Sequence, residues 1–79
     1  MRPRDTYRYT LREGRYIVMY GVAVDPDPRE AEHRRNHPRA VLTIEGPAVT
    51  AEAALAWERA MIEQYCQTHA GKRPKYNKV

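Results

Sequence analysis

The chain has 79 residues and one cysteine, Cys66, which excludes an internal disulfide and a cysteine-based metal cluster. Fourteen Lys and Arg against ten Asp and Glu give a formal net charge of +4. This balance suits a polyanionic partner, most often nucleic acid, although many small basic proteins have no such partner. The N-terminal segment is charged and no run approaches the roughly 20 apolar residues of a membrane span. We therefore expect one domain over residues 1–79, without a signal peptide or membrane contact, in a reducing, cytoplasmic setting.

The first predicted element is a β-hairpin in the stretch "YRYTLREGRYIVMYGVAV", which turns at Glu13 and Gly14. Tyr7 and Tyr9 share one face of its first strand because side chains alternate along a strand. For the same reason Met19 and Tyr20, near the end of the second strand, point to opposite faces. Which of the two faces a functional site is the main question that this hairpin raises.

A short helix is predicted next, in the stretch "DPDPREAEHRRNHP". Asp27 is a plausible N-cap, Pro28 suits the first helical position, and Asn36 lies at the end. The helix has almost no apolar side chain, so burial cannot anchor it. Arg29 and His33 lie four residues apart and share a face, where two cations suit a phosphate oxygen. The alternative is a solvated charged helix.

Residues 39–46 predict a third strand, with Leu42 and Ile44 on one face. A long helix follows over residues 51–70, capped by Thr50 and stopped by Gly71. The order β-β-α-β-α predicts an α+β fold in which helices cover a small antiparallel sheet.

One acidic residue of the long helix falls where its period places apolar side chains. Glu58 lies three residues after Leu55 and four before Ile62. A carboxylate there costs on the order of several kcal/mol unless a polar or charged group meets it. It either pairs with an arginine, lies at the wet end of the stripe, or points into a cleft to hold a metal ion or move a proton. The expected stripe consists of Ala51, Leu55, Ile62, Tyr65, Cys66 and His69, with Trp57 and Met61 beside it.

The spacing of the polar residues in the first half of the chain forms an ordered pattern. Tyr9 is followed two residues later by the apolar Leu11, and Gly21 ends the segment "MYG". Arg29 comes eight residues after Gly21, and His33 comes four residues after Arg29.

The second half continues this pattern with Glu58 in "WERAMIEQY" and with "KYN", which ends at Asn77. Over residues 7–77, the chain resembles the GIY-YIG nuclease domain family, in which a tyrosine hairpin precedes an R-x-x-x-H helix, a helix with one glutamate and a C-terminal asparagine. Each motif is weak alone, and their order and gaps carry the resemblance.

The resemblance implies a three-stranded antiparallel sheet flanked by helices, and a metal-dependent endonuclease that hydrolyses phosphodiester bonds in DNA. Glu58 would hold one divalent ion, Mg²⁺ or Mn²⁺. Arg29, assisted by His33, would stabilise the charge that develops on the phosphate. Tyr9 would position or deprotonate the attacking water, and Asn77 would brace the site.

The sequence departs from the family pattern at the second tyrosine. With Gly21 as the motif glycine, the tyrosine position falls on Met19, which has no hydroxyl. Three explanations are open: a β-bulge rotates Tyr20 inward, Tyr7 supplies the second hydroxyl from the face that carries Tyr9, or the protein binds nucleic acid without efficient cleavage.

Six basic residues are expected to contact nucleic acid: Arg8, Arg34, Arg35, Lys72, Arg73 and Lys75. The partner is expected to be DNA, with RNA and branched DNA as alternatives. Because 79 residues leave little room for a specificity domain, a partner protein could supply specificity, and the oligomeric state is open. A protein-interaction module built on a nuclease-like fold is a further class.

Overall fold

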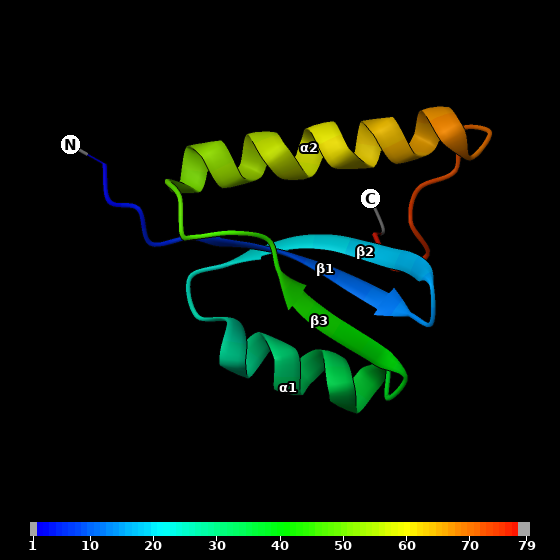
Figure 1. Cartoon of the computed structure of the whole chain (residues 1–79), viewed down its shortest axis with the longest axis horizontal. Helices are drawn as coiled ribbons and strands as arrows, with labels where there is room; N and C mark the ends of the chain where they lie inside the picture. The colour runs from blue at the N-terminus through cyan, green and yellow to red at the C-terminus, as the bar shows by residue number, and fades with distance from the viewer. Residues whose placement is uncertain (1, 78–79) are drawn as a thin grey trace.

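The computed structural model describes residues 2–77 and contains three strands and two helices. β1 (Tyr7–Glu13) and β2 (Tyr16–Ala23) form the hairpin, and α1 (Pro26–Asn36) leads to β3 (Ala40–Ile44) and then to α2 (Ala51–Thr68). The sheet is antiparallel with the strand order β2-β1-β3. Figure 1 shows the sheet between the two helices, with α1 on one side and α2 on the other. The predicted α+β fold with its small antiparallel sheet is confirmed.

The register of the hairpin contains one irregularity near its turn. Leu11 pairs with Met19, whereas the next residue of β1, Arg12, pairs with Ile17. Val18 is therefore an extra residue on β2, a β-bulge of the kind that bends a strand and changes the direction of its side chains.

The pairing assigns the side chains of β1 and β2 to the two faces of the sheet. Tyr9 lies opposite Gly21 on β2 and opposite Ile44 on β3, and this face looks toward α1. Tyr20 lies opposite Thr10 on the other face, toward α2. The core on the α1 side consists of Tyr9, Leu11, Val18 and Ala23, with Met19, Ala40, Leu42 and Tyr76 packed against it.

Helix α1 begins earlier than its sequence pattern predicts. The N-cap is Asp25, not Asp27, and the Asp25 carboxylate accepts a hydrogen bond from the Asp27 backbone amide at 3.2 Å. Pro26 instead of Pro28 therefore opens the helix, since proline needs no hydrogen-bonded amide in the first turn. Two Asp-Pro pairs occur in a row, and β2 already ends at Ala23, which favours the first pair. The helix ends at Asn36, as predicted, and buries none of its residues.

Thr50 caps α2 as predicted, with its hydroxyl accepting from the Ala53 amide at 3.1 Å. The helix ends at Thr68, two residues short of the predicted end, and Gly71 then takes φ +81° while its amide donates to the Cys66 carbonyl at 2.8 Å. This left-handed glycine closes the helix in the usual way. No helix in residues 2–77 is long and apolar enough to cross a membrane.

The predicted apolar stripe of α2 was wrong at three positions. Ala54 is the one fully buried residue of the helix, while Ala51, Leu55 and His69 are exposed. The small Ala54 side chain lets the helix approach the sheet closely, which turns the buried face away from Leu55. Half-buried side chains continue this face: Trp57, Glu58, Met61, Ile62, Tyr65 and Cys66.

Candidate functional site

Tyr9 forms the floor of the candidate site from the central strand. Its side chain is 1% exposed and extends across β2, directly over Gly21. An ideal Cβ on Gly21 would lie 2.7 Å from Cε1 of Tyr9 and closer still to Cζ and the hydroxyl oxygen. The glycine is thus required by the close approach of the phenol ring. In the sequence Gly21 lies eight residues before Arg29, and in the fold it packs against the Tyr9 ring.

Helix α1 brings His33 onto the Tyr9 hydroxyl. The hydroxyl oxygen and Nε2 of His33 are 3.0 Å apart, and the ring centroids are separated by 5.7 Å. This is a direct side-chain contact between two of the residues that the sequence singled out. Arg29 lies one helical turn before His33, and its charge acts on both groups. Helix α1, which buries none of its residues, thus brings the His33 ring to the end of Tyr9, and the exposed Arg29 lies one turn away.

The surroundings of these side chains keep Tyr9 protonated and His33 uncharged at neutral pH. Burial raises the pKa of the Tyr9 hydroxyl above its ordinary value of 10.0, and the Arg29 guanidinium opposes this rise. Burial lowers the pKa of His33 below 6.5, and Arg29 lowers it further, against the neighbouring Glu32 carboxylate. A neutral imidazole can accept a hydrogen bond from the Tyr9 hydroxyl at Nε2. In the resting site the Tyr9 hydroxyl therefore donates a hydrogen bond to Nε2 of His33, and both pKa shifts keep the proton on the tyrosine.

The negative charge of the Glu58 carboxylate, on α2, contributes to the raised pKa of Tyr9. Burial also raises the pKa of the Glu58 carboxyl itself. No ion pair joins Glu58 to a basic residue within the described chain. The explanation that an arginine neutralises it is therefore not supported. Glu58 lines a cavity of about 490 Å³ together with Leu55, Arg59, Ile62, Glu63, Cys66 and Arg73.

A single part-buried carboxylate with no cationic partner suits a hard divalent cation that takes its other ligands from water and phosphate. Across residues 2–77 no group of three or more His, Cys, Asp or Glu side chains is placed to hold a metal ion. Glu58 would then be the sole protein ligand, which is the arrangement that the sequence resemblance implies.

Asn77 holds the backbone of β2 beside the site. Its side-chain oxygen accepts from the Tyr20 amide at 2.8 Å, and its side-chain nitrogen donates to the Tyr20 carbonyl at 2.9 Å. The Tyr76 amide donates to the carbonyl of the bulged Val18 at 2.8 Å. The end of the chain therefore covers the outer edge of β2, and the predicted bracing residue contacts the strand that carries Gly21. Figure 1 shows this segment returning from α2 to β2.

The structure distinguishes Met19 from Tyr20. Tyr20 packs edge-to-face on Trp57 of α2, with ring centroids 5.7 Å apart, on the far face of the sheet from His33. Met19 lies on the face of Tyr9. A bulge is present at Val18, but it does not turn Tyr20 toward the site, so that explanation was wrong. Tyr7 lies on the Tyr9 face, opposite Ala23, while the Tyr9 hydroxyl contacts His33.

The six basic residues expected to contact nucleic acid differ in their surroundings. Arg8 is part-buried against Trp57, and its guanidinium donates to the Pro47 carbonyl at 3.5 Å, so it supports α2 from beneath. Arg34 is exposed and pairs with Glu30 at 3.5 Å. Lys75 is 4.0 Å from Glu13. The other three, Arg35, Lys72 and Arg73, are exposed, and Arg73 lines the Glu58 cavity.

Two contributors escaped the sequence analysis. Glu32 acts on the pKa values of both Tyr9 and His33, and its adjacency to His33 was the available signal. Tyr76 stacks on His37 with centroids 3.7 Å apart and donates to the Glu13 carboxylate at 2.7 Å. No local pattern predicts this second contact, because its partners are 63 residues apart in the chain.

Comparisons of the chain with protein-family models, with curated proteins and with solved structures find no match.

Proposed function

We propose that this chain is a small metal-dependent endonuclease of the GIY-YIG type that hydrolyses phosphodiester bonds in DNA. The proposal depends mainly on the 3.0 Å contact between the Tyr9 hydroxyl and Nε2 of His33. The charges of Arg29 and Glu58 also affect the pKa of this hydroxyl. A phenol, a neutral imidazole, a guanidinium and a carboxylate from three different elements supply the groups that phosphodiester hydrolysis needs. The sequence resemblance supports the same assignment.

Each group has a distinct task in the proposed reaction. As the water attacks the phosphate, it gives a proton to the Tyr9 oxygen while the Tyr9 hydroxyl gives its own proton to Nε2 of His33, so the phenol stays neutral and His33 takes up the proton. Arg29 stabilises negative charge on the phosphate. Glu58 would hold Mg²⁺ or Mn²⁺, which supplies positive charge to the phosphate oxygens when bound. Asn77 keeps β2 and Gly21 in place beneath Tyr9.

The test is nicking of a supercoiled plasmid with Mg²⁺ or Mn²⁺ by wild type, Glu58→Gln and the control Glu63→Gln. Glu58→Gln is expected to lose cleavage by about a hundredfold or more, because it removes the metal ligand. Its thermal midpoint is expected to rise, since burial disfavours the charged Glu58. Glu63 is exposed and lines the same cavity, so Glu63→Gln controls for the loss of one negative charge there and should leave cleavage within a few fold of wild type and the thermal midpoint unchanged. Equal cleavage by wild type and Glu58→Gln contradicts the proposal.

The second candidate function is binding of nucleic acid without efficient cleavage. It is favoured by Met19, which lies on the Tyr9 face and has no hydroxyl, while Tyr20 points to the other face. Binding of this kind weakens steeply with salt because Lys and Arg release counterions from the phosphates.

Met19→Tyr separates the two candidates. In an impaired enzyme the new hydroxyl raises cleavage at least tenfold, because a positioned proton donor or acceptor contributes about 10²–10⁴-fold in full. In a competent enzyme the substitution leaves the rate within a few fold. Met19→Leu controls for the change of shape, and plasmid nicking at equal protein concentration is the measurement.

We propose DNA as the partner, with RNA and branched DNA as alternatives, in a reducing cytoplasmic compartment that keeps Cys66 as a thiol. Any further sequence specificity would come from a partner protein, since the described chain is occupied by the elements that build the site.

A further inference from the structure

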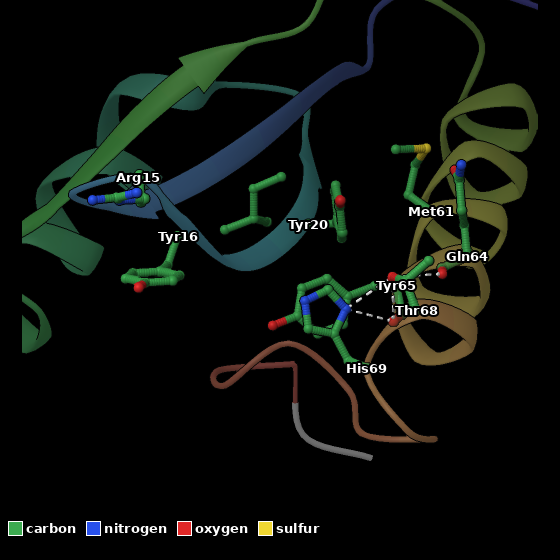
Figure 2. Close-up of a pocket in the computed structure, with 9 residues that line it drawn as sticks. Arg15, Tyr16, Tyr20, Met61, Gln64, Tyr65, Thr68 and His69 are labelled. Atoms are coloured by element: carbon green, nitrogen blue, oxygen red, sulfur yellow. Dashed lines mark hydrogen bonds between the residues drawn. The ribbon is translucent and has the colours of Figure 1, made fainter.

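A second cavity, of about 380 Å³, lies between the hairpin turn and the last turns of α2. Its size falls in the range of small-molecule binding sites. Figure 2 shows Arg15 and Tyr16 of the hairpin on one side, Tyr65 and His69 of α2 on the other, and Tyr20 between them. The proposed reaction uses none of these side chains.

Four of the nine residues that line this cavity carry aromatic rings, and two of these rings contact each other. Tyr65 and His69 stack in parallel with ring centroids 3.6 Å apart. Nδ1 of His69 lies 2.8 Å from the Tyr65 carbonyl oxygen, which holds the imidazole in place. Across the cavity, Tyr16 keeps 69% of its surface in water. Exposure of such a large ring is unfavourable, and a planar ligand would cover it.

The charge of the lining restricts the ligand further. None of the nine lining residues is an aspartate or a glutamate, and Arg15 is a cation at the mouth of the cavity. Gln64 adds an amide that can both donate and accept hydrogen bonds. Aromatic faces, an amide and a cation together match a nucleobase attached to a phosphate, since bases stack on aromatic side chains and Arg binds phosphate.

The cavity lies on the α2 face of the sheet, and β2 and α2 connect it to the residues of the proposed nuclease site. The Tyr20 side chain lines the cavity, its backbone is bound by Asn77, and the next residue is Gly21 beneath Tyr9. The exposed Lys72 and Arg73 follow α2 closely, and Arg73 lines the Glu58 cavity, so both can contact phosphates of a bound strand. Tyr65 lies about 10 Å along the helix axis from Glu58, at roughly 1.5 Å per residue.

We infer that this cavity binds an unpaired base of the nucleic-acid strand that the proposed site acts on. The inference rests on the proposed function and deepens it. The substrate then contains unpaired nucleotides next to the bond to be cut, as single strands and branched structures do. Fully paired DNA keeps its bases stacked and cannot fill the cavity.

The test is binding of a single-stranded oligonucleotide that carries a fluorescent adenine analogue, measured without divalent metal so that nothing is cleaved. Stacking on tyrosine quenches the fluorescence. Tyr16→Leu is expected to weaken binding about fivefold to a hundredfold, because it removes the ring from a stacked base. Tyr16→Phe keeps the ring and should bind as wild type does. Val41→Ala changes another exposed apolar side chain, on β3, and should have no effect.

His69→Ala provides a second, independent variant from the opposite wall, and it should weaken binding in the same direction. The matched duplex with the same analogue should show little quenching. The corresponding mononucleotide should bind more weakly than the strand, because it lacks the phosphates that contact Lys72 and Arg73. Equal affinity of strand and mononucleotide would make a free nucleotide the ligand and overturn the inference.

Wild-type binding by Tyr16→Leu, or equal quenching by duplex and single strand, would also overturn it. The outcome is separable from that of the nuclease proposal. Glu58→Gln should retain the quenching while plasmid nicking is lost, and Tyr16→Leu should lose the quenching in the metal-free assay, in which no cleavage enters the measurement. If the wild type shows quenching but no cleavage, the base-binding cavity is supported and only the nuclease proposal is contradicted.

Discussion

At the scale of single residues, Gly21 and Tyr9 are complementary in shape. The phenol ring occupies the space where any other residue at position 21 would place its Cβ. The glycine therefore decides where the Tyr9 hydroxyl lies, and the hydroxyl meets His33 only in that position.

Gly21→Ala is expected to displace Tyr9 and to destabilise the fold by about 1–3 kcal/mol, the usual cost of overpacking. Unfolding in urea measures the loss. If the clash is the cause, Gly21→Ala should cost less in a Tyr9→Leu background than in the wild type, because the shorter side chain leaves room for the methyl group. Equal costs in both backgrounds would show that the effect comes from elsewhere. Gly14→Ala is no suitable control, since Gly14 takes φ +64°.

At the scale of elements, the segment after α2 covers the outer edge of β2 and bonds to its backbone. Pro74 is fully buried, Tyr76 bonds to Val18, and Asn77 bonds twice to Tyr20. A β-sheet edge otherwise presents unpaired backbone groups. The bulge at Val18 leaves β2 with a carbonyl that the returning chain can reach, so the irregular pairing of the hairpin and the position of the C-terminal segment depend on each other.

Asn77→Ala is expected to lower the free energy of unfolding by about 1–3 kcal/mol, because two hydrogen bonds to the Tyr20 backbone are lost at once. Amide hydrogen exchange at Tyr20 should accelerate accordingly. Lys72→Ala, an exposed change in the same segment, should stay within about 0.5 kcal/mol of wild type. If exchange at Tyr20 is unaffected by Asn77→Ala, the segment does not support β2 in solution.

At the scale of the whole molecule, the shifted groups define a window of pH in which the fold is most stable. The pKa of His33 is lowered by burial, so the unfolded chain binds a proton at this position before the folded chain does. Stability is present above the ordinary value of 6.5 and is lost as pH falls through the lowered pKa. The raised pKa values of Tyr9 and Tyr20, which burial causes, act at the other end.

His33 is therefore expected to lower the thermal midpoint on acidification below pH 6.5, against the opposite effect of the raised Glu58 pKa, and the tyrosines to lower it above pH 10.0. In the alkaline limb the unfolded chain loses its phenolic protons first, so stability declines as pH rises through the raised pKa values. His33→Gln should remove part of the acidic decline, and Tyr9→Phe part of the alkaline one. Calorimetry across this range is the measurement, and an unchanged acidic limb in His33→Gln would contradict the assignment.

Much of the architecture follows from local patterns. The alternating tyrosine hairpin, the Thr50 cap and the position of Glu58 within the buried face of α2 depend on neighbours a few residues away, and each is present in the fold. The pairing of Tyr9 with His33 also agrees with the sequence spacing. The predicted start of α1 was wrong because two Asp-Pro pairs lie close together, and Asp25 instead of Asp27 caps the helix.

By itself, then, the sequence determined the order β-β-α-β-α and the polar residues that no simple core explains, because periodicity and capping are short-range. Only the tertiary structure decided that Met19 shares the face of Tyr9 while Tyr20 packs on Trp57. Only the tertiary structure shows that the buried face of α2 is centred on Ala54 and that Asn77 bonds to β2. These features depend on strand register and on contacts across almost the whole chain, where backbone pairing and close packing act between residues that are distant in sequence.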